Sequence, residues 1–553
     1  MLEVNKSPFF LTEDDIRWVE ETLRSLTVEQ KAGQLFVVVD SPFNKKEPAD
    51  LLAIEPGGIH VFAEGEKSKE RQQAAIAELQ SRIKVPLLVS GDLESGGQGG
   101  SPDGTNFASN MQIGAVDDPR LSLAFGRGIG KEGAAMGFNW VFGPVVDINY
   151  NFQNPIVNTR AFGDTPERVA KHAIPVLQGI QEDGRVASCV KHWPGDGMDD
   201  RDQHKVLTLN SMSMGEWRET YGKVYRQAID AGVKSVMSAH IALPAYYEEL
   251  GIANIRRRNT PGSLSYELNT LLLRGELGFD GLIVSDATSM LGMDTFGPRA
   301  EIVPRCIAAG VDMFLFTRDM RYDYEAMLQG VKKGIVTEKR LDEAVTRILA
   351  LKASLGLRKT KSCDSAELDI VGCSEHRALA TELARRAVTL VKDTQGIVPL
   401  TPAKHKRILL IASADANSMF GDGGSDGTEF ERMLTGEGFE VTREYVLEEA
   451  DPSIDAVIYL IKRAPGFLEP SLRMTNAQAG GLFTWYPTRI QTIFVSLGNP
   501  YVLYEMPSMP TVVNAYNSTL TVQREVLNAL LGRQPFLGRS PVDAFCGLEW
   551  ARL

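Results

Sequence analysis

The sequence lacks the features by which several classes of protein are recognised. Its cysteines are few and scattered, and no two of them form a C-x-x-C pair, so it indicates neither a disulfide framework nor a zinc site. It has no apolar run of about eighteen residues, so we expect no membrane span. Its first residues lack the apolar segment of a signal peptide, so we expect a cytoplasmic protein. The cysteines are Cys189, Cys306, Cys363, Cys373 and Cys546.

The sequence also lacks an excess of basic residues. Its 59 Lys and Arg are outnumbered by 71 Asp and Glu, which gives a formal net charge of −12. Nucleic acids and anionic membranes bind to basic surfaces, so we expect neither as a partner. A hydrophobic content of 43% is that of an ordinary globular protein, and 553 residues exceed one ordinary core. We therefore expect two or three domains and a small neutral substrate.

Eight short apolar runs, rich in β-branched residues, recur over the first two thirds of the chain. Most are separated by segments with helical periodicity, such as residues 68–83 and 164–183. Apolar strands that alternate with helices are typical of a parallel sheet buried on both faces. The pattern therefore predicts an α/β protein with a TIM-like (β/α)₈ barrel over residues 1–357. The runs are residues 34–40, 57–63, 85–92, 139–148, 186–193, 235–241, 281–287 and 312–317.

The last third of the chain has a different organisation. Residues 358–374 have the composition of a linker, and the segment that follows, 375–393, is predicted to be a helix. Four further apolar runs, RILLIASA, DAVIYLIK, QTIFVSLG and TVVNAYN, alternate with helical segments. This pattern predicts that the barrel is followed by a smaller αβα sandwich domain over residues 375–553.

Polar residues stand at or just past the ends of six of the predicted barrel strands. In a parallel barrel these ends meet on one face, where active sites are built. Acids that follow strands also serve as turn or helix-cap residues, which is the simpler explanation for any one of them. Six together, two of them histidines, favour a site. They are Asp40, Asp92, Asp147, His192, His240 and Asp286.

The stretch KHWPGDGMDDRDQH, residues 191–204, holds two of the seven histidines and four aspartates. Its spacing does not fit a calcium loop, and two histidines twelve residues apart do not define a zinc site, so no metal is expected. Asp202 could hold His204 in one tautomer and make it a proton shuttle, or the segment could be a solvated acidic loop. The spacing alone does not decide between these two. Gly195 and Gly197 are expected to make the loop flexible.

A nucleophile for such chemistry is also present. Asp286 follows the apolar run LIVS and has small neighbours, so it is expected on a rigid strand end at the barrel mouth. A carboxylate there could form a covalent glycosyl-enzyme intermediate. By contrast, the G-x-G-x-x-G pattern at residues 128–133 does not follow a strand, and we interpret it as close helix packing, not as a nucleotide site.

These motifs resemble glycoside hydrolase family 3, in particular its β-N-acetylglucosaminidase branch. KHWPGDG is similar to the family's KHFPGHG, DQH to its D-S-H, and IVSDATSM to its nucleophile motif. NPIVNTRAFGDTP is similar to a segment that contacts the sugar, and the resemblance extends through the C-terminal domain. The family's fold is a barrel followed by an αβα sandwich. Two departures are Asp196, where the family has a second histidine, and LESGG after Asp92, where DQEGG would stand.

The resemblance implies a retaining, exo-acting β-N-acetylglucosaminidase without a cofactor. Asp286 would be the nucleophile, and Asp202 with His204 the acid/base dyad that marks the N-acetyl branch. Contacts to the sugar would come from Asp92, Arg160, Lys191 and His192. Lys191, if buried, needs a partner, and Asp92 is a candidate.

Two alternatives to hydrolysis follow from the same residues. A neutral imidazole does not repel an anion as a carboxylate would, so phosphate could replace water and give a β-N-acetylglucosaminide phosphorylase. A non-catalytic sugar-binding protein is the other alternative, and the presence of every catalytic residue argues against it. We expect a small carbohydrate as the substrate and a monomer or a homodimer as the assembly.

Overall fold

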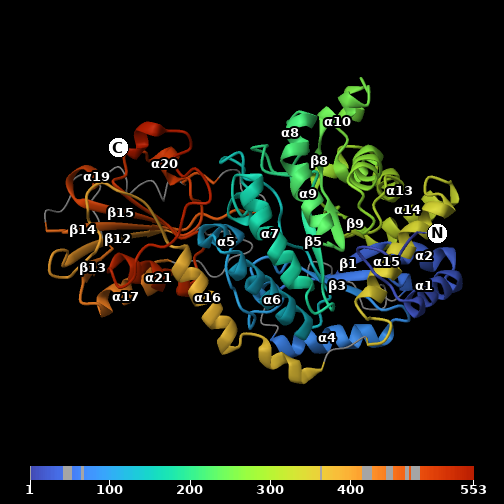
Figure 1. Ribbon diagram of the computed structural model, residues 1–553, viewed down its shortest axis with the longest axis horizontal. Helices are drawn as coiled ribbons and strands as arrows, with labels where there is room; N and C mark the ends of the chain where they lie inside the picture. The colour runs from blue at the N-terminus through green and yellow to red at the C-terminus, as the bar shows by residue number, and fades with distance from the viewer. Residues whose placement is uncertain are drawn as a thin grey trace. The chain divides into compact units, whose positions relative to one another are not determined.

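The computed structural model describes residues 2–40, 53–63, 68–360, 364–413, 426–443, 453–466, 472–474 and 486–553. The chain forms two compact units (Figure 1). The first, here called the barrel unit, comprises Met1–Asn106, Ser122–Ile148 and Val169–His376. The second, here called the sandwich unit, comprises Phe107–Leu121, Asn149–Arg168 and Arg377–Leu553. Two short segments expected in the N-terminal domain, 107–121 and 149–168, thus group with the second unit.

The barrel unit is built on an eight-stranded sheet in which every pair of neighbouring strands is parallel. The strand order is β10–β1–β2–β3–β4–β5–β7–β9, and a parallel bridge between Val284 and Met313 nearly closes it. Each strand falls within one of the eight predicted apolar runs, so the predicted barrel is confirmed. The strands are β1 (Phe36–Asp40), β2 (Gly58–Val61), β3 (Leu88–Gly91), β4 (Trp140–Val141), β5 (Ala187–Trp193), β7 (Ser235–Ser238), β9 (Leu282–Ser285) and β10 (Phe314–Leu315).

Helices alternate with these strands, as expected for buried parallel strands. Several begin at a side-chain cap, for example Ser68, which accepts the N–H of Arg71, and Thr337, which accepts that of Arg340. The helices of this part of the chain are α1 (Glu13–Ser25), α2 (Val28–Gln34), α4 (Lys69–Arg82), α6 (Pro119–Ala135), α7 (Pro166–Gln181), α8 (Met214–Glu219), α9 (Tyr221–Asp230), α10 (Pro244–Glu249), α11 (Ile255–Arg258), η4 (Glu267–Glu276), α12 (Leu291–Asp294), α13 (Arg299–Ala308), α14 (Met320–Lys332) and α15 (Glu338–Ser354).

The glycines of the G-x-G-x-x-G segment lie in α6 and allow this helix to pack closely against α7. A Cβ atom on Gly130 would lie 2.7 Å from the carbonyl oxygen of Ile180, and one on Gly126, a turn earlier, would collide with the carbonyl oxygen of Val176. The segment is therefore a helix-packing element, as predicted, and opens no phosphate-binding loop.

The sandwich unit contains a six-stranded sheet in the order β11–β16–β15–β14–β12–β13. All its pairs are parallel except β11 with β16. Alternate residues of its strands enter two separate cores, so that Leu410 and Ile458 lie in one, and Leu409 and Val457 in the other. The elements are α5 (Asn110–Val116), α16 (Ser374–Ala387), β11 (Thr389–Asp393), β12 (Arg407–Ser413), α17 (Thr428–Gly436), β13 (Glu440–Thr442), β14 (Ala456–Ile461), α19 (Tyr486–Arg489), β15 (Gln491–Ser496), α20 (Val502–Glu505), β16 (Thr511–Asn514) and α21 (Leu520–Leu530).

The helix predicted over residues 375–393 was partly wrong. It ends at Ala387, and Thr389–Asp393 form strand β11 instead, paired antiparallel with β16. The segment VTLV is rich in β-branched residues, and pairing with β16 satisfies backbone groups that a longer helix would satisfy internally. Where the chain is described, none of its helices combines the length and the apolar character needed to cross a membrane.

Candidate active site

The carboxyl ends of the barrel strands carry the polar residues that the sequence predicted there. Asp92 follows β3, His192 lies in β5, His240 lies two residues beyond β7, and Asp286 follows β9. Because all eight strands are parallel, these ends lie on the same face of the barrel. The side chain of Asp40, the candidate on β1, lies outside the described residues, as does Cys363.

Asp286 is held by the strand end and buried, with only 5% of its surface exposed. Its backbone N–H donates to the carbonyl oxygen of Ser238 at 2.8 Å, and its Oδ1 accepts the N–H of Ala287 at 2.7 Å. Its Oδ2 is buried and has no hydrogen-bond partner among the residues that the structure describes. The carboxylate therefore has one oxygen fixed by the backbone and one available for chemistry.

Three imidazoles control the charge of this carboxylate. Burial raises the pKa of Asp286, but the nearby imidazoles of His192, His240 and His204 together bring that pKa below the ordinary value of an aspartate. The group is thus ionised at neutral pH although it is removed from water. An ionised, desolvated carboxylate on a rigid strand end has the properties required of a nucleophile.

Asp202 and His204 form the pair that their spacing suggested. The Nδ1 of His204 lies 2.7 Å from the Oδ1 of Asp202, and the backbone N–H of His204 donates to the same oxygen at 2.8 Å. Because a carboxylate can only accept there, Nδ1 carries the hydrogen and Nε2 is the nitrogen available for proton transfer. The side chain of Asp202 is 3% exposed and that of His204 is 23% exposed, so the imidazole is the accessible member.

The segment between β5 and the short strand β6 (Thr208–Leu209), residues 194–207, is here called the β5–β6 loop. It was expected to be flexible because of its glycines, but the structure gives them another role. Gly195 and Gly197 have φ values of +120° and +106°, and a side chain on them would collide with the Tyr221 ring and the Ile148 carbonyl, respectively. The glycines therefore permit a tight path against the barrel.

The acidic residues of this loop are also not simply solvated. Asp199 pairs with Arg201 at 2.6 Å and accepts the backbone N–H of Leu209 at 2.9 Å. Strand β6 then pairs with β8 (Ile241–Ala242), which follows His240 in the chain. The loop that carries the Asp202–His204 pair is thus fastened at its base.

Lys191 is almost fully buried between two carboxylates. Its Nζ lies 3.0 Å from Asp92, the predicted partner, and 2.7 Å from Glu94. Glu94 was not singled out in the sequence. The available signal was its position two residues after Asp92 in the same βα loop. His60, also not singled out, is fully buried in an aromatic cluster with its Nε2 3.6 Å from Asp92, and burial lowers its pKa to about 4.

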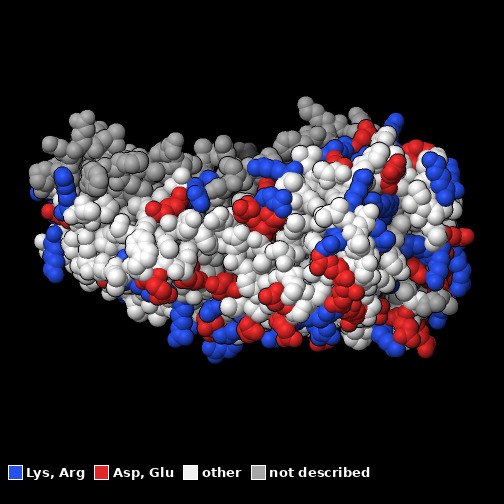
Figure 2. Space-filling model, turned by 90° about the horizontal axis from the view of Figure 1, so that it is seen from above, with Lys and Arg blue, Asp and Glu red and all other residues white. Residues whose placement is uncertain are grey.

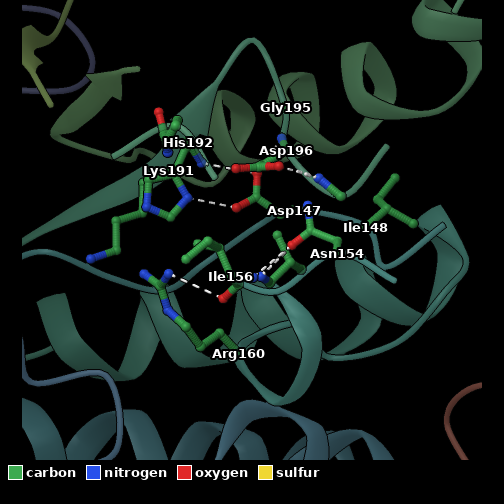
Figure 3. A network of polar contacts seen from close by, with 12 residues as sticks. Asp147, Ile148, Asn154, Ile156, Arg160, Lys191, His192, Gly195 and Asp196 are labelled. Atoms are coloured by element: carbon green, nitrogen blue, oxygen red, sulfur yellow. Dashed lines mark hydrogen bonds and ion pairs between the residues drawn. The ribbon is translucent and has the colours of Figure 1, made fainter. Parts of the chain in front are cut away.

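His192 is held by a second buried carboxylate, that of Asp147 (Figure 3). Its Nδ1 lies 2.6 Å from Asp147 Oδ2, and its backbone N–H donates to Oδ1 at 3.0 Å. The same Oδ1 accepts the N–H of Asp196 at 2.8 Å. The aspartate that departs from the family motif thus uses its backbone to bind Asp147, and its own Oδ1 accepts the N–H of Gly197 at 2.6 Å.

Arg160 lies in the sandwich unit, whereas the other predicted site residues lie in the barrel unit. Its local support comes from its own segment. The guanidinium donates to the carbonyl of Ile156 at 3.4 Å, and the side chain of Asn154 accepts the N–H groups of Ile156 and Val157 (Figure 3). In the described part of the chain no group of three or more His, Cys, Asp or Glu is arranged to hold a metal ion.

The comparison with known families decides the assignment of the chain. The model described as "Glycosyl hydrolase family 3 N terminal domain" matches residues 27–351, which contain the barrel and every site residue described above. The chain belongs to glycoside hydrolase family 3. The resemblance inferred from the motifs is thus confirmed, and with it the assignment as a glycoside hydrolase, since several relatives carry β-hexosaminidase names.

Similar proteins extend the match beyond the barrel. The chain is 40% identical to a β-N-acetylglucosaminidase/β-glucosidase of Cellulomonas fimi, over 100% of this chain and 99% of the relative. Among solved structures, it resembles the β-glucoside phosphorylase BglX, with 35% identity, 99% coverage of both chains and a TM-score of 0.92. It also resembles a family 3 β-N-acetylglucosaminidase from Paenibacillus sp. str. FPU-7, with 26% identity, 94% and 99% coverage and a TM-score of 0.80. The two-domain architecture is thus that of solved family 3 enzymes.

Proposed function

We propose that this family 3 enzyme is a retaining, exo-acting β-N-acetylglucosaminidase. The observation that carries the proposal is the Asp202–His204 pair, held at the strand-end face that also carries the buried, ionised Asp286. A fixed carboxylate and a carboxylate-backed imidazole are the two groups that a double displacement at a sugar requires. The name of the Cellulomonas fimi relative supports the substrate class.

In the first step, Asp286 Oδ2 attacks the anomeric carbon of the β-linked sugar. The bond to the leaving oxygen breaks as the Nε2–H of His204 gives its proton to that oxygen. Asp202 keeps Nδ1 protonated throughout, so the proton is exchanged only at Nε2. The product of this step is an α-linked glycosyl ester on Asp286.

In the second step, neutral His204 accepts a proton from water through Nε2. The water oxygen attacks the anomeric carbon and releases Asp286, so the sugar leaves with its β configuration restored. Lys191 with Asp92, His192 and Arg160 would bind the sugar hydroxyls and the acetamido group. Lys191 and His192 suit this role because their donors are fixed by buried carboxylates.

A second candidate is phosphorolysis at the same residues. It is favoured by the similarity to BglX, whose name is that of a β-glucoside phosphorylase. Phosphate would replace water in the second step, and retention would give β-N-acetylglucosamine 1-phosphate. A neutral His204 does not repel phosphate as a second carboxylate would.

Product analysis tests both functions. The enzyme is incubated with chitobiose in a phosphate buffer and in a buffer without phosphate, and the products are identified by mass spectrometry. Hydrolysis predicts free N-acetylglucosamine at the same rate in both buffers. A sugar 1-phosphate formed only with phosphate would establish the phosphorylase, and failure to cleave nitrophenyl N-acetylglucosaminide at all would exclude both.

The two residue roles can be tested separately. Trapping with a 5-fluoro glycosyl donor, followed by peptide mass spectrometry, is expected to label Asp286, and a label on another residue would contradict its role. His204→Ala is expected to slow substrates with poor leaving groups about 10²–10⁴-fold and activated aryl glycosides far less, because only poor leaving groups need a proton. Equal losses would remove His204 from the acid role.

A further inference from the structure

Gln203, the residue between the two members of the dyad, is bonded to the far side of the site. Its side chain is buried with the residue 1% exposed, and its Oε1 accepts the backbone N–H of His240 at 3.0 Å. His240 lies just beyond β7, the strand adjacent to the nucleophile strand β9. The tip of the β5–β6 loop is therefore tied to the barrel by a side chain from within the dyad motif.

His240 continues this connection to the nucleophile. Its Nε2 lies 3.0 Å from the carbonyl oxygen of Ala287, the residue after Asp286, and its Nδ1 lies 2.8 Å from Ser263 Oγ. A carbonyl only accepts, so Nε2 carries the hydrogen and Nδ1 accepts from the serine. Burial lowers the pKa of His240, which agrees with a neutral ring in this single tautomer. Two hydrogen bonds thus join Gln203 to the backbone beside Asp286.

A second set of contacts holds the same loop tip from the β9 side. The N–H of Leu291, the first residue of α12, donates to the carbonyl oxygen of His204 at 3.0 Å. The next residue, Gly292, leaves no room for a side chain. Its Cβ would lie 2.6 Å from the carbonyl oxygen of Gln203 and 3.0 Å from the Cβ of His240. The loop tip therefore rests directly on the backbone of α12.

We propose that Gln203 is a positioning residue that locks the β5–β6 loop, through His240 and with Gly292 as its seat, so that His204 stays at a fixed position relative to Asp286. The inference rests on the proposed function in one respect, namely that His204 is the acid/base. The position of a proton donor governs the rate steeply, since a displacement of about 1 Å can cost on the order of 10²-fold. A loop that carries such a donor therefore benefits from a lock.

Gln203→Met is the first test, because methionine keeps the volume of the side chain and removes the acceptor oxygen. We expect kcat for chitobiose to fall about 10- to 100-fold, with nitrophenyl N-acetylglucosaminide affected much less and KM little changed for both. Hydrogen exchange is expected to accelerate in residues 196–207 and nowhere else. A role in packing alone would not separate the two leaving groups.

Gly292→Ala attacks the same contact from the other side and is expected to reproduce both effects, since its methyl group must displace the Gln203 carbonyl. Gly215→Ala in helix α8 is the matched control, because a Cβ there meets only Ser213 Oγ at 4.0 Å. It should change neither the kinetics nor the exchange.

The failures of the two proposals are distinguishable. If His204→Ala discriminates between leaving groups but Gln203→Met and Gly292→Ala match the wild type in kinetics and in exchange, the lock is wrong and the proposed function stands. If His204→Ala does not discriminate, the acid role is wrong. In that case exchange in residues 196–207 still decides whether Gln203 holds the loop, and unchanged exchange overturns the lock.

Discussion

At the scale of single residues, the site consists of two ionic arrangements with different demands. Asp286 must be ionised without a cation in direct contact, and the imidazoles of His192, His240 and His204 achieve this from a distance. Lys191, in contrast, is paired with both Asp92 and Glu94. The first arrangement leaves a carboxylate oxygen free for attack, and the second fixes donors for binding.

Replacing His192 tests the electrostatic control of Asp286. His192 is the largest favourable influence on this carboxylate, so His192→Gln removes a positive charge at acid pH and raises the pKa of Asp286. The enzyme needs the ionised form, so activity is lost as the pH falls through this pKa. The acid limb of the kcat/KM profile for nitrophenyl N-acetylglucosaminide should therefore move to higher pH.

The control for this measurement is His405→Gln, in the sandwich unit, where His405 contacts Gln491. It should leave the profile unchanged. His192→Gln is also expected to lower kcat/KM at every pH, because a proposed sugar contact is lost, but that loss changes the height and not the position of the limb. An acid limb that stays in place or moves to lower pH would contradict the electrostatic argument.

Sequence reasoning reached some of these residues and missed others for a physical reason. The pairs Asp202–His204 and Lys191–Asp92 were predictable because motif spacing and the need of a buried lysine for a partner pointed to them. Glu94 was missed because a single acid in a loop is ordinarily solvated. Its importance arises only when the fold brings it to Lys191, 97 positions away in the chain.

At the scale of elements, the packing of α6 on α7 depends on the absence of side chains. Gly126→Ala would force the two helices apart at the Val176 carbonyl, and overpacking of this kind costs about 1–3 kcal/mol. Thermal unfolding of the full chain should show a lower Tm for this variant. Gly215→Ala, also in a helix but without close neighbours, should be neutral or stabilising by up to about 1 kcal/mol. Equal effects of the two would contradict the packing role of Gly126.

The elements themselves were predictable where their pattern is local. The eight barrel strands are continuous apolar runs because they are buried on both faces, and that signal is strong in a single sequence. The end of α16 was not predictable in the same way. Residues 388–393 continue an apolar pattern that suits a helix, and only the pairing of β11 with β16, 120 residues further along, makes them a strand. Likewise, the positive φ of Gly195 and Gly197 could be read as flexibility until the Tyr221 ring was placed against them.

At the scale of the whole molecule, the two units are interleaved along the chain. Segments 107–121 and 149–168 belong to the sandwich unit, although they interrupt the sequence of the barrel. Sequence patterns indicate whether a segment is helical or extended, but the core that it joins depends on contacts between distant residues. Arg160, which the family resemblance assigns to the sugar site, lies in one of these segments.

The charge of the molecule bears on which substrates it can take. The net charge is −12, and on the face shown in Figure 2 acidic and basic side chains are interspersed, without an extended basic area among the described residues. Such a field repels anions over a distance set by the ionic strength. Neutral sugars approach without this barrier, whereas substrates that carry carboxylates, and phosphate itself, have to overcome it.

Salt should therefore affect neutral and anionic substrates differently. Raising NaCl from about 0.01 M to about 0.15 M shortens the Debye length from about 30 Å to about 8 Å. We expect kcat/KM for chitobiose to stay nearly constant, and kcat/KM for an N-acetylglucosaminide with a carboxylate-bearing leaving group to rise about two- to fivefold as the repulsion is screened. Potassium fluoride at the same ionic strengths controls for specific binding of chloride. A decrease for the anionic substrate would mean that basic groups near the site attract it, and would overturn the expectation, drawn from the net charge, that neutral substrates are favoured.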